Sequence, residues 1–187
     1  MTDQEIVFAT IRALDAAGVE YMVVGSLSSN AYGFPRATQD ADLVMKVDAA
    51  SVSSLAKQLP EPLRLDPQMS FETVTGTNRF VVNAKRSHYK VELFLLSDDP
   101  HDRERFRRRV RGEAFGQSVW LPTPEDVIIS KLRWSKHGKR SKDVEDIKGV
   151  LLVQRGKLDD AYLNRWCEVH ETRDLLESIR LQLSGSS

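Results

Sequence analysis

Hydrophobic residues near the start of the chain follow first a helical spacing and then a strand spacing. Residues 3–17 carry apolar positions at helical intervals among helix-forming residues, and Gly18 is a typical helix end. Residues 19–24 (V-E-Y-M-V-V) form an apolar, β-branched run that predicts a strand. Residues 26–32 are small and compatible with a second helix. The pattern therefore predicts a helix, a strand and a helix, in that order.

The alternation continues as far as residue 121. Apolar, β-branched runs predict strands, and turn residues separate them from the predicted helices. The predicted elements are a strand at 41–47, a helix at 49–59, strands at 71–74, 79–83 and 89–96, a helix at 102–110 and a hairpin that ends at 119–121. Strands mixed with helices in this way indicate an α/β (α+β) domain with a mixed central sheet flanked by helices.

The pattern changes at Pro122. Thr123 suits a helix cap and Pro124 suits the first helical turn. The residues that follow are helical in pattern to the end of the chain. We therefore expect two parts, an α/β domain at 1–122 and a small helical part at 123–187.

Composition places the chain among ordinary globular proteins. Hydrophobic residues make up 41% and charged residues 29% of its 187 residues. No apolar run approaches the roughly 20 residues that span a bilayer. The first residues lack the basic start and apolar core of a secretion signal. The single cysteine, Cys167, rules out an internal disulfide and is interpreted as a small apolar helix residue. We expect a cytoplasmic protein.

The charges are unevenly placed although the net charge is zero. Between His101 and Lys142 there are twelve Lys or Arg residues against five Asp or Glu residues. A local positive field suits a protein that handles polyanions, and solvated helix faces give similar runs. The arginines of this segment are Arg103, Arg105, Arg107, Arg108, Arg109 and Arg111. They fit RNA phosphate binding and equally fit one solvated helix that buries only Phe106.

Two aspartates, Asp40 and Asp42, are the main candidates for metal binding. At positions i and i+2 of a strand they point to the same face, where two carboxylates repel each other unless a cation bridges them. Magnesium fits, because it takes one or two carboxylates and completes its octahedron with water and substrate phosphates. Such a pair is also common on solvent-facing strand edges, so the pair alone is a weak signal.

Thirteen residues separate a Gly-Ser pair from the two aspartates. Gly25 and Ser26 fall at a predicted strand-to-helix turn, where backbone N–H groups and a hydroxyl point at an anion near a helix N-terminus. Gly25 allows a phosphate to approach the backbone closely. Glu92, inside an apolar predicted strand, is costly to bury without a partner and is the candidate third carboxylate. It would bind metal or take a proton from an attacking hydroxyl.

These residues carry a family resemblance. The V-G-S of residues 24–26 with the D-x-D of residues 40–42 resembles the signature of the DNA polymerase β-like nucleotidyltransferase superfamily. Residues 36–43 (R-A-T-Q-D-A-D-L) are similar to the R-x-T-x-D-x-D-L form of AbiEii-type and related minimal nucleotidyltransferases. Residues 122–131 and 140–147 are similar to downstream elements of that family, P-x-x-E-D-L-I-x-x-K-L and R-x-K-D-x-x-D-I.

The resemblance implies a nucleotidyltransferase fold that binds an NTP with Mg²⁺ or Mn²⁺. It also implies that Lys131 contacts the nucleotide phosphates and that Asp143 lies near the same cleft; the alternative is a lysine–aspartate pair on a helix surface. Asp146, three residues on, faces the same way as Asp143. Arg36 is a candidate phosphate clamp.

We assign no chemical role to the histidines or to two of the tryptophans. The four histidines show no metal-ligand spacing and are interpreted as surface residues; they are His88, His101, His137 and His170. Trp134 and Trp166 are interpreted as core residues of the helical part.

Two functional hypotheses follow. The first is an enzyme in which Asp40, Asp42 and Glu92 hold the metal and Gly25, Ser26, Arg36, Lys131 and Asp143 hold the nucleotide. Its acceptor would be RNA, a protein hydroxyl or a small molecule such as an aminoglycoside, with a toxin-like enzyme and a cognate antitoxin favoured weakly by the resemblance. The second is a non-catalytic binding module of the same fold, which Glu92 favours because the family more usually has aspartate there.

Overall fold

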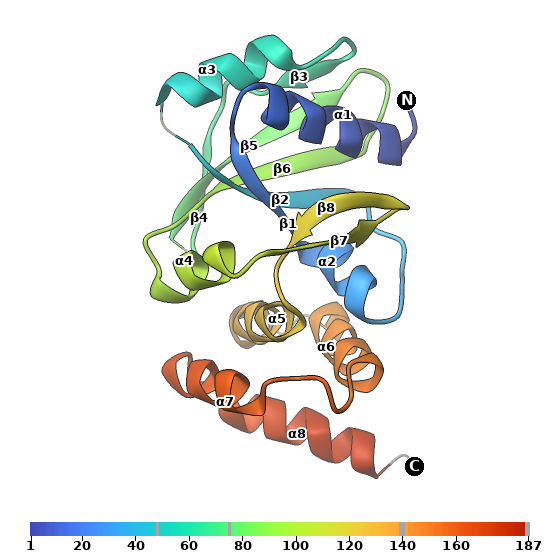
Figure 1. Ribbon diagram of the computed structural model, residues 1–187, viewed down its shortest axis with the longest axis vertical. Helices are drawn as coiled ribbons and strands as arrows, with labels where there is room; N and C mark the ends of the chain where they lie inside the picture. Colours follow the sequence, from blue (N-terminus) through green and yellow to red (C-terminus); the bar gives the residue numbers. More distant parts are fainter. Residues whose placement is uncertain (48, 75, 139–140, 186–187) are drawn as a thin grey trace.

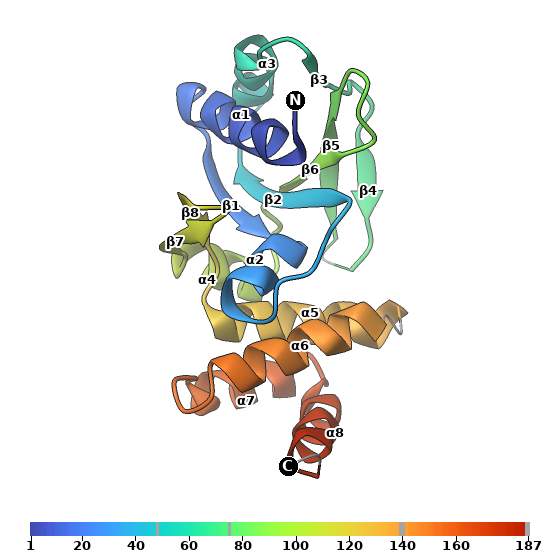
Figure 2. The same cartoon turned by 90° about the vertical axis from the view of Figure 1, so that its right-hand side faces the viewer.

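The chain folds into stacked layers, seen edge-on in Figure 1. The computed structural model describes every residue except 48, 75, 139, 140, 186 and 187, and the side chains at 49–50 and 137–138 also lie outside the description. Helices α1 and α3 cover one face of the central sheet, and α5 and α6 lie beyond its other face. Helices α7 and α8 form the outermost layer, at the end of the molecule opposite the N-terminus (Figures 1 and 2).

The central sheet is mixed, as predicted. Its strand order is β1-β2-β6-β5-β3, with β4 also paired to β5. The pairing of β2 with β6 is parallel and the other pairings are antiparallel. The strands are β1 (Glu20–Val24), β2 (Asp40–Lys46), β3 (Leu63–Leu65), β4 (Ser70–Glu72), β5 (Thr77–Ala84) and β6 (Lys90–Leu95). A separate hairpin joins β7 (Val110–Ala114) to β8 (Gln117–Leu121).

Eight helices complete the described part of the chain. Those before residue 122 are α1 (Asp3–Ala16), α2 (Gly25–Tyr32), α3 (Ala49–Gln58) and α4 (Pro100–Arg107). Those after it are α5 (Pro124–Gly138), α6 (Ser141–Val153), α7 (Asp160–Val169) and α8 (Arg173–Ser184). Among the described residues, no helix combines the length and apolarity needed to cross a bilayer.

Local sequence explains the helix ends. Thr2 and Glu5 form a reciprocal capping box at the start of α1, and Gly18, at φ +69°, turns the chain after it. Thr123 accepts a hydrogen bond from the N–H of Asp126 at 3.4 Å, so it caps α5 as predicted. The start of α2 differs slightly from the prediction, because the helix begins at Gly25 itself.

The buried apolar residues form two main clusters. One contains residues from Ile6 to Leu121, and the other contains residues from Val127 to Ile179, including Cys167. Tyr32 packs against both clusters and donates a hydrogen bond to the carbonyl of Pro122 at 2.9 Å. Burial raises the pKa of Tyr32 to about 12, so it stays a donor. Along the chain, the first cluster ends and the second begins close to Pro122. The division into two domains stays a prediction.

Two stretches differ from the predicted elements. Residues 63–65 form β3, which the sequence did not indicate because the strand is short and follows Pro60 and Pro62. Helix α4 ends at Arg107, and the chain turns at once into β7, whereas the pattern predicted a helix as far as residue 110.

Candidate active site

Three carboxylates from neighbouring strands face one cleft. Asp40 and Asp42 lie two residues apart on β2, so both point to the same face of the sheet. Glu92 on β6 is the parallel pairing partner of Asp42, which places its side chain on that face as well. All three line a cleft of about 280 Å³ between the sheet and α5. The donors are hard carboxylate oxygens, which fit Mg²⁺ or Mn²⁺.

Gly25 is closely fitted to Asp42. It directly follows β1 and begins α2 with φ +61°, a conformation that favours glycine. A Cβ added here would lie 2.0 Å from Oδ2 of Asp42. The glycine therefore makes room for the carboxylate, a role that the sequence analysis did not foresee.

Asp40 is held from two sides. Its Oδ1 accepts a hydrogen bond from the Thr38 hydroxyl at 2.9 Å, and its carbonyl accepts one from the Tyr89 hydroxyl at 3.0 Å. Burial, reinforced by the negative charges of Asp3, Asp40 and Asp42, raises the pKa of Tyr89. The strand end that carries the aspartates is thus a strongly negative position.

The opposite wall of the cleft carries a buried cation. Lys131 on α5 places its Nζ 2.9 Å from Oδ1 of Asp143 and 2.9 Å from Oδ2 of Asp146, which both project from α6. Lys131 is 9% exposed, so it is not the surface lysine of the alternative interpretation. Lys131 and Asp143 both line the cleft.

A second cation, Arg36, joins this wall to the Gly-Ser turn. Its guanidinium makes a two-pronged ion pair with Asp146, at 2.7 and 2.9 Å, and donates to the Ser26 hydroxyl at 2.9 Å. The bond to Asp146 is the main cause that raises the pKa of Arg36. Burial by itself would raise the pKa of Asp146, but hydrogen bonds from Arg36 and Lys131 outweigh it and lower that pKa. Arg140, the first residue of the R-x-K-D-x-x-D-I motif at residues 140–147, lies outside the described residues.

The cleft also contains residues that the sequence analysis did not assign to a site. Arg79 on β5 donates to Oε2 of Glu92 at 2.5 Å. Asp102 and Arg105 of α4 form an ion pair at 2.9 Å at another part of the lining. Arg79 and Glu92 meet because they occupy neighbouring positions on the paired strands β5 and β6. The sequence analysis missed this contact because it depends on the register of that pairing.

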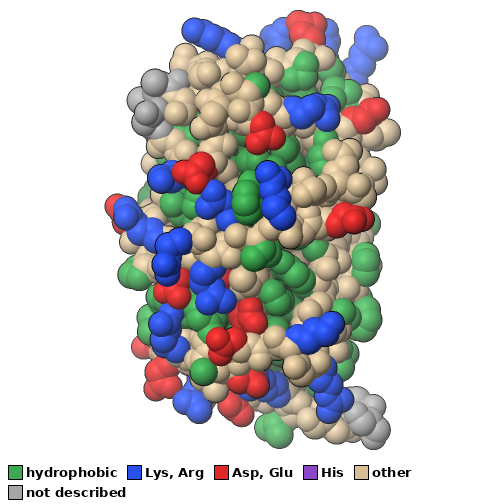
Figure 3. Space-filling model, viewed as in Figure 1, with side chains coloured by type: hydrophobic (Ala, Val, Ile, Leu, Met, Phe, Trp, Pro, Cys, Tyr) green, Lys and Arg blue, Asp and Glu red, His purple; other side chains and the backbone are tan. Residues whose placement is uncertain are grey.

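The arginine-rich segment is partly turned inward. Phe106 is buried, as the solvated-helix interpretation requires, but Arg105 is buried too through its pair with Asp102. Arg109 pairs with Glu20 at 2.6 Å. The exposed arginines are Arg103, Arg107 and Arg111. Figure 3 shows Lys and Arg side chains mixed with acidic ones near the level of α4, so the surface there carries both signs of charge.

The surface interpretation is wrong for two histidines. His101 is 0% exposed because its ring is enclosed beside Asp126, with Nε2 3.0 Å from Oδ1. His170 is half-buried, and burial lowers the pKa of both rings, that of His170 to about 4. His88 is exposed as predicted, and the side chain of His137 lies outside the described residues.

The two tryptophans also differ from each other. Trp166 is buried in the cluster of the helical part, as predicted. Trp134 is only partly buried and lines the cleft one turn beyond Lys131, so the core interpretation is wrong for it.

Solved structures share this fold at low sequence identity. ANT(2")-Ia in complex with adenylyl-2"-tobramycin is similar at a TM-score of 0.63 and 12% identity, over 92% of this chain and 99% of that one. A putative nucleotidyltransferase from H. pylori gives 0.55 and 16%, over 96% and 80% of the two chains. An antigenic nucleotidyltransferase-like protein from Paracoccidioides brasiliensis gives 0.51 and 20%, over 95% and 92%. Together they show the nucleotidyltransferase fold.

The sequence itself identifies the family. No curated protein matches it. A family described as "Nucleotidyltransferase of unknown function (DUF6036)" matches residues 5–182, which is nearly the whole chain. The chain therefore belongs to this nucleotidyltransferase family.

Proposed function

We propose that the protein is a Mg²⁺- or Mn²⁺-dependent enzyme that transfers a nucleoside monophosphate from an NTP to an acceptor hydroxyl. The observation that carries this proposal is the register of β2 with β6, which sets Asp42 beside Glu92 with Asp40 on the same face. The same cleft contains the Gly25–Ser26 turn and Lys131. The three carboxylates thus face, across one space, a wall on which Lys131 and Arg36 are paired with Asp143 and Asp146 of α6.

In the proposed reaction the acceptor oxygen forms a bond to the α-phosphorus. The bond from that phosphorus to the β-phosphate bridging oxygen breaks, and pyrophosphate leaves. Glu92 accepts the proton of the attacking hydroxyl. Asp40 and Asp42 would hold a divalent ion, with Glu92 as a third ligand where it does not act as the base, and the ion would supply charge neutralisation for the phosphates.

The wall that carries Lys131 and Arg36 has the second role, binding the triphosphate. Lys131 and Arg36 are held in place by Asp143 and Asp146, so the chain positions them without a ligand. Such positioning lowers the entropy lost when phosphate oxygens bind. The N–H groups at the start of α2 add a partial positive charge at the Gly25–Ser26 turn.

Two similarities bear on the identity of the acceptor. The similarity of residues 36–43 to AbiEii-type enzymes supports RNA, with a cognate antitoxin as partner. The structural similarity to ANT(2")-Ia supports a small molecule with hydroxyl groups. Incubation of the protein with each α-³²P-NTP, Mg²⁺ and either cell RNA, cell protein or aminoglycosides tests the three acceptor classes in parallel. Label in none of them, with Mn²⁺ as well as Mg²⁺, would contradict the enzyme proposal.

One contact favours a second function, a non-catalytic nucleotide-binding module. The guanidinium of Arg79 donates a hydrogen bond to Oε2 of Glu92. This is an oxygen with which Glu92 would otherwise accept a proton or bind a metal ion. If this pair persists when nucleotide is bound, the cleft binds NTP without transfer. NTP binding without label transfer, in the same set of incubations, would support this alternative.

A further inference from the structure

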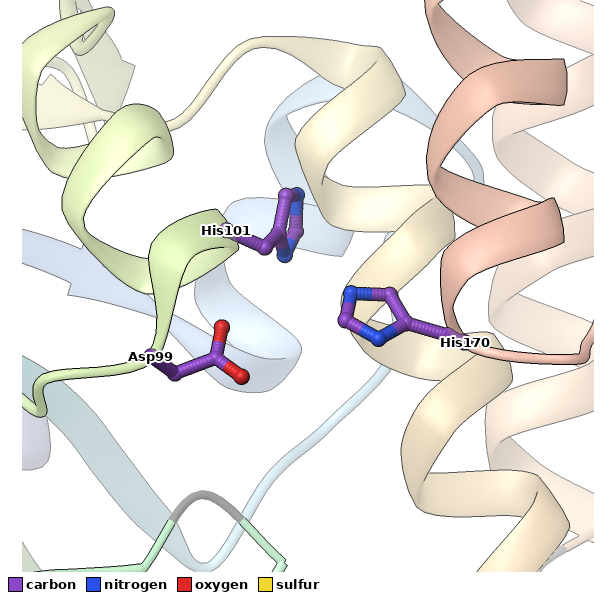
Figure 4. A group of neighbouring side chains, drawn as sticks. All are labelled: Asp99, His101 and His170. Atoms are coloured by element: carbon purple, nitrogen blue, oxygen red, sulfur yellow. The ribbon is translucent and has the colours of Figure 1, made fainter.

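Three side chains outside the cleft converge where α4 meets the end of α7. Asp99 caps α4, His101 lies in its first turn, and His170 follows α7. Figure 4 shows the two imidazole rings next to each other, edge to face, with the Asp99 carboxylate beside them. Each residue offers one ligand atom, and the three atoms lie within 4.8 Å of one another. One ion at the centre of such a group is within reach of all three after small side-chain movements.

His101 is oriented by a hydrogen bond on the far side of its ring. The Asp126 carboxylate already accepts from the Tyr162 hydroxyl at 2.7 Å and from the Thr123 hydroxyl at 3.0 Å. An ionised carboxylate only accepts, so Nε2 of His101 is the donor at 3.0 Å, and in the neutral ring Nδ1 keeps its lone pair. A carboxylate that orients an imidazole in this manner is the usual outer partner of a metal-bound histidine.

The inner nitrogens of both rings are unsatisfied. Within the described part of the chain, neither Nδ1 of His101 nor Nε2 of His170 has a hydrogen-bond partner, although both atoms are buried. His101 is 0% exposed, so bulk water does not reach its ring. A buried lone pair without a partner costs free energy, and a metal ion would satisfy two of them at once.

Asp99 retains capacity for one more partner. Its Oδ1 accepts from the N–H of Asp102 at 3.0 Å and from Arg133 at 3.3 Å, and its Oδ2 accepts from Arg133 at 3.1 Å. A carboxylate has about four acceptor positions. These contacts leave one position on Oδ2 for coordination through a single oxygen.

The surrounding charge decides which kind of ion fits. The carboxylates of this region are matched by the guanidinium groups of Arg105, Arg108 and Arg133, so the field does not attract every cation. Binding must therefore come from the imidazole nitrogens. Zn²⁺ and similar transition ions prefer such nitrogen ligands, whereas Mg²⁺ and Ca²⁺ prefer oxygen ligands. We propose that Asp99, His101 and His170 form a transition-metal site, of the Zn²⁺ class, that links α4 to the end of α7.

The site has three protein ligands and therefore leaves one position open to water, as zinc sites with two nitrogens and one oxygen commonly do. Its position gives it a structural effect, because α4 belongs to the part before Pro122 and His170 to the helical part after it. An ion here holds the two parts together beside the cleft, without contact to Asp40 or Asp42. This inference does not depend on the proposed transfer reaction.

Calorimetric titration of Zn²⁺ into the purified, chelator-treated protein tests the proposal, with excess Mg²⁺ present to occupy carboxylate sites. We expect one equivalent of Zn²⁺ to bind and the melting temperature to rise. His170→Gln removes one ligand and should weaken binding by about tenfold or more. His88→Gln, which changes an exposed histidine, is the matched control and should bind as the wild type does.

Two further measurements keep the result unambiguous. Co²⁺ in place of Zn²⁺ should give visible absorption typical of nitrogen ligation, and Asp42→Asn should leave that absorption unchanged because the active-site carboxylates are not involved. Circular dichroism of His170→Gln shows that the variant is folded. Absence of Zn²⁺ binding by the wild type, or equal binding by folded His170→Gln, would overturn the assignment.

Discussion

The carboxylate of Asp42 occupies the space that a side chain at residue 25 would need. A Cβ on Gly25 would lie 2.0 Å from Oδ2 and 2.9 Å from Cγ of Asp42. Gly25 also has φ +61°, so two separate constraints select glycine at the start of α2. The Gly25 turn and strand β2 are therefore one fitted unit.

The first prediction concerns Gly25→Ala. The added methyl should push the Asp42 carboxylate out of position and abolish the rise in melting temperature produced by Mg²⁺ with NTP. Gly18→Ala is the matched control, because Gly18 has φ +69° and a Cβ there meets nothing within 4 Å. Both changes should cost about 1–2 kcal/mol of folding free energy from the left-handed backbone. A full ligand response in folded Gly25→Ala would show that the contact with Asp42 is unimportant for binding.

The second prediction concerns the metal directly. Asp42→Asn should remove the thermal shift caused by Mg²⁺ with NTP, while the ligand-free protein stays folded because repulsion from Asp40 and Glu92 is relieved. For the wild type at a ligand concentration of about 100 times Kd, the expected stabilisation is about 2.7 kcal/mol. Differential scanning fluorimetry measures both quantities, with Asp98→Asn, at an exposed side chain, as control. An undiminished shift in Asp42→Asn would place the metal elsewhere.

The third prediction separates the enzyme from the binding module at Glu92. Glu92→Gln should keep most of the NTP affinity but cut turnover by about 10²-fold or more, the usual effect of losing a positioned base. Glu92→Asp shortens the side chain by one methylene group and should be slower than the wild type if the site is adapted to glutamate. Equal turnover in all three proteins would make Glu92 a structural residue. Transfer by Glu92→Asp alone would support the binding module.

A fourth prediction concerns Arg79, which shares Oε2 of Glu92. Arg79→Met removes the competing guanidinium and keeps much of the apolar stem, so Mn²⁺ without nucleotide should bind more tightly than to the wild type. Electron paramagnetic resonance of free Mn²⁺ measures this affinity. Weaker Mn²⁺ binding would mean that Arg79 holds Glu92 in the geometry that the metal needs.

The fifth prediction concerns Asp146, which both Arg36 and Lys131 contact. Asp146→Asn leaves two cations facing one carboxylate and should destabilise the ligand-free protein by about 3–5 kcal/mol. The shift in melting temperature caused by NTP should increase, because the uncompensated positive charge attracts phosphate more than the loss of positioning by Asp146 weakens its binding. Glu145→Gln, at an exposed neighbour on α6, should change neither value. A smaller NTP shift in Asp146→Asn would contradict this account.

The pH dependence of this effect follows from the sign of the pKa shift. Because the folded pKa of Asp146 lies below its ordinary value of 3.8, the unfolded state takes up the proton first as the pH falls. The stabilisation by Asp146 is therefore complete above that ordinary value and is lost as the pH falls through the folded pKa. The difference in unfolding free energy between the wild type and Asp146→Asn should shrink over that acidic range.

The sequence predicted those features that depend on local spacing. The alternation in β2 and the break at Gly25 are visible in short windows, so Asp40, Asp42 and the turn were placed on the right elements. The cap at Thr123 was found for the same reason. These predictions needed no knowledge of the tertiary structure.

Features that depend on long-range packing were missed. Nothing near His101 in the sequence indicates that Asp126, on a different helix, accepts its N–H and encloses it. The contact of Arg79 with Glu92 follows from the register of β5 with β6, which a single sequence does not specify. Strand β3 has only three residues and too weak a pattern to detect.

The parallel register of β2 and β6 has a consequence for the fidelity of assembly. Glu92 lies between Val91 and Leu93, both 0% exposed, which point to the opposite face of the sheet. A slip of one residue in this pairing would turn Glu92 into the hydrophobic core and expose both apolar neighbours to the cleft. The apolar face of β6 thus enforces the register that places Glu92 in the cleft, because a shifted pairing would lose the buried contacts of Val91 and Leu93.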